Sequence, residues 1–148
     1  MSSPRHILTV LFAAMAFLAT AFASEYGTAE EARAMLQKAI AALKNDEAKA
    51  LAAFNNKESE FRDRDLYVFC GGPDGKLTAH PRAKGKTLRG FKDSTGKAVG
   101  EEMYMVAKEG TISEVVYLYP RRRGEEPREK ITLITKVGNQ ICGVGYYK

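Results

Sequence analysis

The stretch LYVFCGGPDGKLTAH, residues 66–80, decides the fold of this 148-residue chain. Residues 66–70 are mostly aromatic or β-branched, which favours an extended strand. GGPDG at 71–75 supplies residues typical of a tight turn, and residues 76–80 resume an extended pattern. The stretch therefore predicts a β-hairpin, and the segments on either side are interpreted in relation to its sheet.

Downstream of the hairpin, three more strands are predicted over residues 112–119, 129–137 and 140–147. A polar tip at 120–127 separates the first two, and Gly138-Asn139 forms a two-residue turn before the last. Together with the hairpin they form a sheet of five antiparallel strands.

Upstream, Thr28 and Glu31 have the spacing of a capping box, which marks the start of a helix. Apolar residues recur at helical spacing from there to Phe54, with an interruption at Asn45-Asp46. We expect one long amphipathic helix from about Thr28 to Phe54.

A loop is predicted over residues 81–96, and a short second helix over 97–109, ended by Gly110. The element order predicts an α+β domain in which helices cover one face of an antiparallel sheet.

The first 23 residues have the pattern of a secretory signal peptide. Arg5 precedes an uncharged run at 7–23, and Ala21 and Ala23 provide the small residues that a signal peptidase requires. The alternative is an uncleaved anchor, although the run is shorter than the roughly 20 residues that span a bilayer. We expect cleavage after Ala23, leaving residues 24–148 as a single periplasmic or secreted domain.

Composition and charge exclude several classes of protein. With 45% apolar and 28% charged residues, the chain is neither disordered nor collagen-like. Its net charge of +5 is modest, and the run Arg121-Arg122-Arg123 is followed closely by Glu125 and Glu126. A solvated hairpin tip is therefore favoured over a nucleic-acid site, and we expect no nucleic-acid partner.

The chain has few residues of the types that form disulfides, bind metal ions or act in catalysis. Cys70 and Cys142 are the two cysteines, and the sequence leaves open whether they form a disulfide or remain as two buried thiols. His80 is the one histidine after residue 23, so we expect no metal site and no cofactor. Paired carboxylates such as Glu101-Glu102 lie on a charged helix face, and no catalytic set is predicted.

An ordered set of segments resembles a known family. The segments are YVF (67–69), DGK (74–76), LTAHP (77–81), GKTL (85–88), DSTGK (93–97), KEG (108–110), YLYP (117–120), Lys130 and ICGVGYY (141–147). This set resembles the single Cache domains of the second type, which are extracytoplasmic small-molecule sensors with a PAS-like sheet. The resemblance extends from Thr28 to Lys148.

The resemblance implies a pocket for a small organic ligand, commonly a carboxylate, between the central sheet and the connecting loop. In the family the module usually lies between two transmembrane helices of a chemoreceptor or kinase. For this chain we expect a non-enzymatic binding domain that acts with a separate membrane signalling protein. The alternative is an interaction or structural module with a vestigial pocket, whose helix at 28–54 forms a homodimer or docks on a receptor.

Six residues are candidates for the ligand site. Tyr117 and Tyr119 lie two apart on a strand and so share a face, where they act as ligand-binding phenols or as core aromatics. Lys130 on the partner strand is either a cation for a carboxylate or a solvent-facing charge. His80 lies either at the pocket or in a structural hydrogen bond that fixes the covering loop. Phe69 and Tyr104 are candidates for the apolar wall or for ordinary packing.

Overall fold

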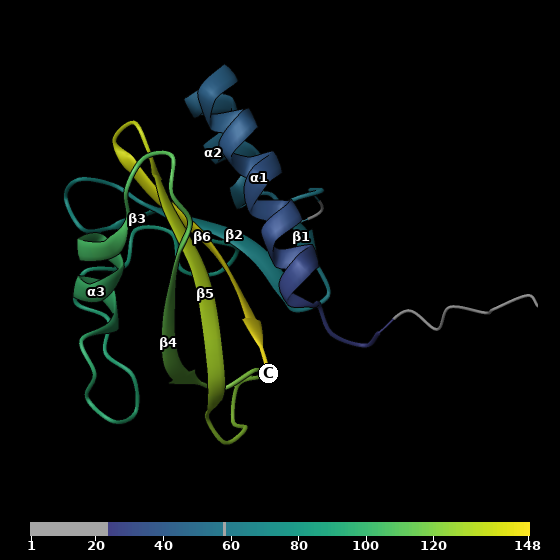
Figure 1. Ribbon diagram of the computed structural model, residues 1–148, viewed down its shortest axis with the longest axis vertical. Coiled ribbons are helices and arrows are strands. Elements are labelled where there is room, and N and C mark those ends of the chain that lie inside the picture. Colours follow the sequence, from purple (N-terminus) through teal and green to yellow (C-terminus); the bar gives the residue numbers. More distant parts are fainter. Residues whose placement is uncertain (1–23, 58) are drawn as a thin grey trace, which may run out of the picture.

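The computed structural model describes residues 24–57 and 59–148. In chain order its elements are α1 (Ala29–Asn45), α2 (Glu47–Asn55), β1 (Arg62–Asp63), β2 (Leu66–Gly71), β3 (Leu77–Ala79), α3 (Val99–Val106), β4 (Ser113–Tyr119), β5 (Arg128–Val137) and β6 (Gln140–Tyr147), as Figure 1 shows. The sheet has the order β1-β2-β6-β5-β4, with β3 on β2, and every pair is antiparallel. The α+β class is confirmed. The described sheet has six strands rather than five because β1, two residues long, is too short to give a sequence pattern.

The long N-terminal helix is broken in two. Thr28 caps α1 through the expected box, because the Glu31 backbone N–H donates to the Thr28 hydroxyl and the Glu31 carboxylate accepts from the Thr28 N–H. Asp46 then leaves the helical conformation, and its carboxylate accepts from the Lys49 N–H to cap α2. The expectation of one continuous helix is therefore wrong, since Asp46 both ends α1 and starts α2.

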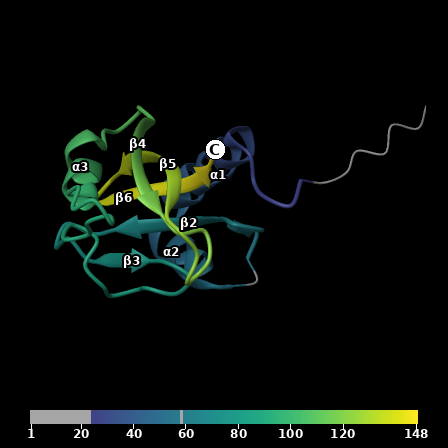
Figure 2. The same cartoon turned by 90° about the horizontal axis from the view of Figure 1, so that it is seen from below.

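The helices lie on both faces of the sheet, and the expectation that they cover a single face is wrong. Figures 1 and 2 show α1 and α2 on one side of the strands and α3 on the other. Alternate residues of one strand accordingly join different cores: Leu133 packs in the core with α1 and α2, whereas Ile134 packs in the core with α3. The sheet is thus buried on both sides.

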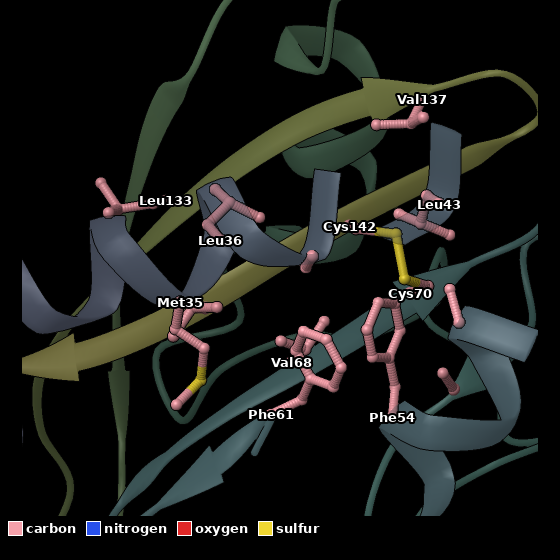
Figure 3. Packing of buried hydrophobic residues seen from close by; sticks show 14 of the residues in the cluster. Met35, Leu36, Leu43, Phe54, Phe61, Val68, Cys70, Leu133, Val137 and Cys142 are labelled. Carbon is pink, nitrogen blue, oxygen red and sulfur yellow. A yellow bond between two sulfur atoms is a disulfide. The ribbon is translucent and has the colours of Figure 1, made fainter. Parts of the chain in front are cut away.

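The core between α1, α2 and the sheet is continuous and apolar (Figure 3). Leu36, Phe54 and Val68 are almost completely buried in it. Cys70 and Cys142 lie directly opposite each other in the β2–β6 ladder and are joined by a disulfide within this core. The disulfide ties the first hairpin to the last strand across 72 residues of chain.

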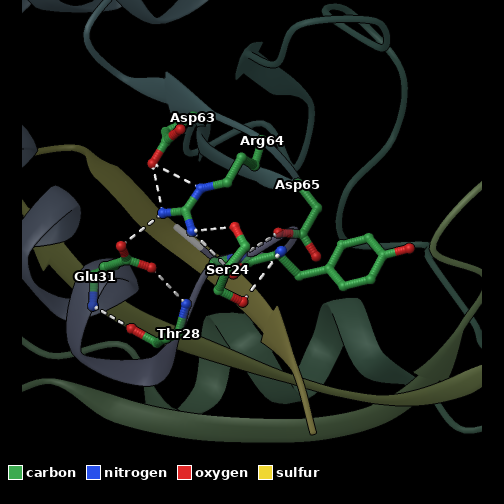
Figure 4. A network of polar contacts seen from close by, with 8 residues as sticks. Ser24, Thr28, Glu31, Asp63, Arg64 and Asp65 are labelled. Atoms are coloured by element: carbon green, nitrogen blue, oxygen red, sulfur yellow. Dashed lines mark hydrogen bonds and ion pairs between the residues drawn. The ribbon is translucent and has the colours of Figure 1, made fainter. Parts of the chain in front are cut away.

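The first described residues are held against the domain by a polar network (Figure 4). Arg64 donates to the carbonyl oxygens of Ser24 and Tyr26 at 3.1 and 3.0 Å and pairs with Glu31 at 2.6 Å. Asp65 accepts from the Gly27 N–H at 2.7 Å. The expected signal peptide lies outside the described residues, within which no helix is long and apolar enough to cross a membrane.

The basic run at the β4–β5 tip is solvated only in part. Arg122 and Arg123 are exposed, as expected. The Arg121 side chain is only 10% exposed, with its Nε 3.2 Å from Asp65 Oδ2. Its guanidinium lies 3.7 Å from the centre of the Tyr26 ring and 4.7 Å from that of Tyr147. A fully solvated tip is therefore wrong for Arg121, because the tip folds back onto the N-terminal segment.

Removing the disulfide is expected to destabilise the fold. In the double variant Cys70→Ala/Cys142→Ala the unfolded chain regains the freedom of a 72-residue loop. We expect the free energy of unfolding to fall by about 2–5 kcal/mol, measured by urea denaturation. Dithiothreitol should lower the urea concentration at which half of the native protein is unfolded, and it should leave this midpoint unchanged in the double variant. Equal midpoints for the two proteins under oxidising conditions would contradict a stabilising role.

Candidate functional site

A cavity of about 230 Å³ lies on the α3 side of the sheet, beneath the loop that follows β3. Strands β2, β4 and β5 supply its floor, α3 supplies Met103, and the loop supplies the cover. The lining residues are Tyr67, Phe69, Leu77, His80, Ala83, Lys86, Thr87, Leu88, Phe91, Met103, Tyr117, Tyr119 and Lys130. The cavity is smaller than the roughly 300–1,000 Å³ that drug-sized ligands occupy, so it suits a molecule of a few heavy atoms.

Strand β6 makes room for this site through its glycines. Gly145 lies opposite Thr132 in the β5–β6 ladder. A Cβ atom at Gly145 would overlap the Lys130 Cε and lie 2.9 Å from the Thr132 hydroxyl. The missing side chain therefore lets Lys130 lie across β6 and into the cavity.

Lys130 is the central polar group of the cavity. It is only 4% exposed, so the interpretation as a solvent-facing charge is wrong. Its ammonium donates to the Tyr67 hydroxyl at 3.4 Å and lies 5.0, 5.3 and 5.1 Å from the ring centres of Tyr67, Tyr119 and Tyr147. These cation–π contacts stabilise the ammonium without neutralising it.

No carboxylate of the described residues compensates this charge. Among the described residues, no Asp or Glu lines the cavity, and none forms an ion pair with Lys130. Burial alone would lower the pKa of Lys130, but the phenols of Tyr67, Tyr117 and Tyr147 outweigh it and hold this pKa above its usual value. The ammonium is therefore charged at neutral pH and is buried without an anion from the described residues beside it.

The two tyrosines of β4 share a face, as the spacing predicts, and both line the cavity. Tyr117 is buried, its hydroxyl lies 3.0 Å from that of Thr132, and burial raises its pKa. Tyr119 is 39% exposed and lies toward the mouth. Phe91 packs edge-on against both rings at 5.7 Å. Tyr117 is thus both a core aromatic and a wall of the cavity, whereas Tyr119 keeps an open phenol.

His80 combines both of its expected roles. Its Nδ1 accepts hydrogen bonds from the backbone N–H groups of Arg82 and Ala83 at 3.0 and 3.1 Å, which fixes the start of the covering loop. Its ring lines the cavity, 5.0 Å from the Tyr67 ring. Burial first, then the charges of Lys130, Arg82 and Lys86, lower the pKa of His80 to about 4. The imidazole is therefore neutral at pH 7.

Of the two remaining candidates, Phe69 lines the cavity and Tyr104 does not. The Tyr104 hydroxyl donates to the Gly72 carbonyl at 2.7 Å, and its ring stacks 3.9 Å from the Arg89 guanidinium carbon. Tyr104 therefore fastens α3 to the β2–β3 turn, and its neighbour Met103 faces the cavity instead.

The sequence analysis did not name eight of the lining residues as candidates, namely Tyr67, Leu77, Ala83, Lys86, Thr87, Leu88, Phe91 and Met103. Tyr67 lies two residues before Phe69 on β2, so strand alternation was a sufficient signal. Lys86 and Phe91 lie in the loop, which has no periodicity to read. Among the described residues, no group of three His, Cys, Asp or Glu side chains could hold a metal ion.

The comparison with protein families identifies the fold. The model described as Cache domain matches residues 21–146, nearly the whole chain. This chain belongs to the Cache domain family. The resemblance seen in the sequence is thereby confirmed, and no curated protein matches the chain.

Two solved structures share the Cache fold. One is described as the periplasmic sensor domain of a chemotaxis protein, with a TM-score of 0.56 and 22% identity over 80% of this chain and 88% of that one. The other is a Cache chemosensory domain described as recognising a carboxylic acid, with a TM-score of 0.62 and 20% identity over 80% and 91% of the two chains. At these identities the likeness concerns the fold.

The low pKa of His80 predicts a change in stability with pH. The unfolded chain binds a proton on His80 near pH 6.5, whereas the folded protein resists protonation down to about pH 4. The contribution of the His80 imidazole to the free energy of unfolding is therefore complete above pH 6.5 and is lost as the pH falls toward 4. We expect His80→Asn, whose amide oxygen can accept the same N–H bonds, to show a smaller drop in Tm over this range. Parallel curves of Tm against pH would contradict this role.

Proposed function

We propose that this Cache domain is an exported sensor that binds a small carboxylate, and that Lys130 is the group that pairs with it. The observation that supports this most strongly is the buried ammonium without an anion. A ligand carboxylate would supply the missing charge beside an ammonium that is almost completely buried, where a charged hydrogen bond is strong.

The phenols extend this chemistry. Tyr67 lies at hydrogen-bond distance from Lys130, and Tyr119 has a hydroxyl for which the described residues provide no partner. Both can donate to a second carboxylate oxygen, while Phe69, Leu77 and Met103 offer apolar surface to a short carbon chain. Carboxylic acid recognition by the Cache chemosensory domain of the second solved structure supports the same ligand class.

We also propose a location and a partner for the domain. A periplasmic location after cleavage at Ala23 is supported by the charge pattern of residues 1–23 and by the fold shared with a periplasmic chemotaxis sensor domain. We propose that the partner is a membrane signalling protein. No observation favours the alternative interaction module, because the outer side of α1 exposes Arg33, Gln37, Lys38 and Lys44 rather than an apolar stripe.

Replacing Lys130 should abolish carboxylate binding without lowering the stability of the unliganded domain. In Lys130→Met an apolar chain of similar length fills the space without a buried charge. We expect Tm without ligand to stay equal or rise, and the shift produced by carboxylates to disappear. The probes are acetate, propionate, butyrate and pyruvate in a thermal-shift assay, with propionamide as the uncharged control.

Lys136→Met is the matched control, because Lys136 lies on the same strand with its side chain exposed. It should keep the response to carboxylates. A carboxylate shift that survives in Lys130→Met would overturn the assignment of Lys130, and no shift with any carboxylate in the native protein would overturn the ligand class.

Gly145→Ala tests the placement of the ammonium rather than its charge. The new methyl group overlaps the flexible end of Lys130 and lies 2.9 Å from the Thr132 hydroxyl, so both side chains have to shift. We expect Tm to change by only a few degrees and carboxylate affinity to fall about tenfold or more, measured by isothermal titration calorimetry. Unchanged affinity would mean that the position of Lys130 over β6 is unimportant.

A further inference from the structure

A second hollow of about 510 Å³ adjoins the carboxylate cavity, and we call it the vestibule. Both are lined by Tyr67, His80, Ala83, Lys86, Tyr119 and Lys130. A ligand held at Lys130 therefore extends into the vestibule if it is longer than the cavity.

The vestibule is strongly basic. Arg64 and Arg121 line it, but each is paired with a carboxylate, Arg64 with Glu31 and Asp63 and Arg121 with Asp65. Asp65 is the one acidic side chain in its described lining.

Four further cations line the vestibule, namely Arg62, Arg82, Lys86 and Arg123. Within the described residues none of these four has an ion-pair partner. Four positive charges of the described residues therefore lie around the vestibule without a carboxylate partner among those residues.

Two of these cations lie on backbone that hydrogen bonds hold in place. The Lys86 carbonyl accepts from the Leu77 N–H at 2.8 Å and its N–H donates to the Ala83 carbonyl at 3.0 Å, which joins this part of the loop to β3. The Arg82 N–H donates to His80. Arg82, Lys86 and Lys130 line the vestibule together with His80, and the charges of all three lower the pKa of His80.

We infer that the vestibule is a second anion subsite, so that the ligand is a small dianion with one carboxylate at Lys130 and another anionic group near Lys86 and Arg82. This inference rests on the proposed function. A lone exposed lysine adds little affinity because water screens it. Several cations facing one space without a competing carboxylate act together on a group already held by the first contact.

The test compares ligands that differ in one charge. Succinate and butyrate have the same number of carbons, and isothermal titration calorimetry of the native protein at low ionic strength gives both affinities. We expect succinate to bind about tenfold more tightly, and added salt to reduce this difference. 3-Phosphonopropionate distinguishes a second carboxylate from a phosphate-like group, and tighter binding than butyrate by either dianion supports the inference.

Lys86→Gln should reduce the affinity for succinate about threefold more than the affinity for butyrate, because Lys86 lines the vestibule as well as the cavity. Lys84→Gln is the matched control, since Lys84 lies two residues away on the same loop and lines a different hollow beside α2. Lys84→Gln should leave the affinities for succinate and for butyrate unchanged.

Two results would overturn the second subsite. If butyrate binds and neither dianion binds more tightly, the subsite is wrong while the carboxylate site at Lys130 stands. If no monoanion or dianion binds, the proposed function fails and the subsite fails with it.

Discussion

The burial of strands β5 and β6 on both faces is the constraint on which the rest of the structure depends. On the side that faces α1 and α2 the strands must fill space, and Leu133 and Val144 do so. On the other side they must leave space, which Gly143 and Gly145 provide. A Cβ atom at Gly143 would lie 2.7 Å from the Leu133 carbonyl oxygen and 3.0 Å from the Phe69 ring. The alternation of bulky and absent side chains along β6 therefore fills one core and opens the site in the other.

Within that space the surrounding groups leave the charge of Lys130 without compensation. His80 is neutral at pH 7, and burial first raises the pKa of Tyr147 to about 12, so this phenol is neutral as well. The nearest polar groups are thus dipoles and rings, which hold an ammonium in place and leave its field intact. A carboxylate in the same position would stabilise the empty protein and compete with an anionic ligand. An ammonium left without a carboxylate partner among the described residues is what the anion site that we propose requires.

Strand alternation and capping chemistry were enough to predict much of the fold from the sequence. The capping box at Thr28, the turn at 71–75 and the strands from 112 onward follow from local residue types, and the structure has them. The break at Asp46 was visible only as an interruption, because a polar residue in a helix and a cap between two helices have the same sequence pattern. The face of the sheet on which each helix packs could not be predicted from local patterns, since it depends on how segments far apart in the chain meet.

The same limit applies to the candidate site. Tyr117, Tyr119 and Phe69 were identified because a strand has a period of two, whereas Tyr104 and Met103 are neighbours on α3 and only the packing angle decides which of them faces the cavity. Whether Lys130 is solvated depends on Gly145, which lies on a different strand.

The rim of the site and the N-terminal segment share one side chain, and this connects the cavity to the chain that precedes α1. The Arg121 guanidinium lies between the rings of Tyr26 and Tyr147, and the Tyr147 ring contacts the Lys130 ammonium. Tyr147 is also fixed at its other end, because its hydroxyl donates to the Pro120 carbonyl at 3.0 Å. Arg121 contacts both that ring and the Tyr26 ring. An unbroken series of ring and cation contacts therefore runs from Lys130 through Tyr147 and Arg121 to Tyr26.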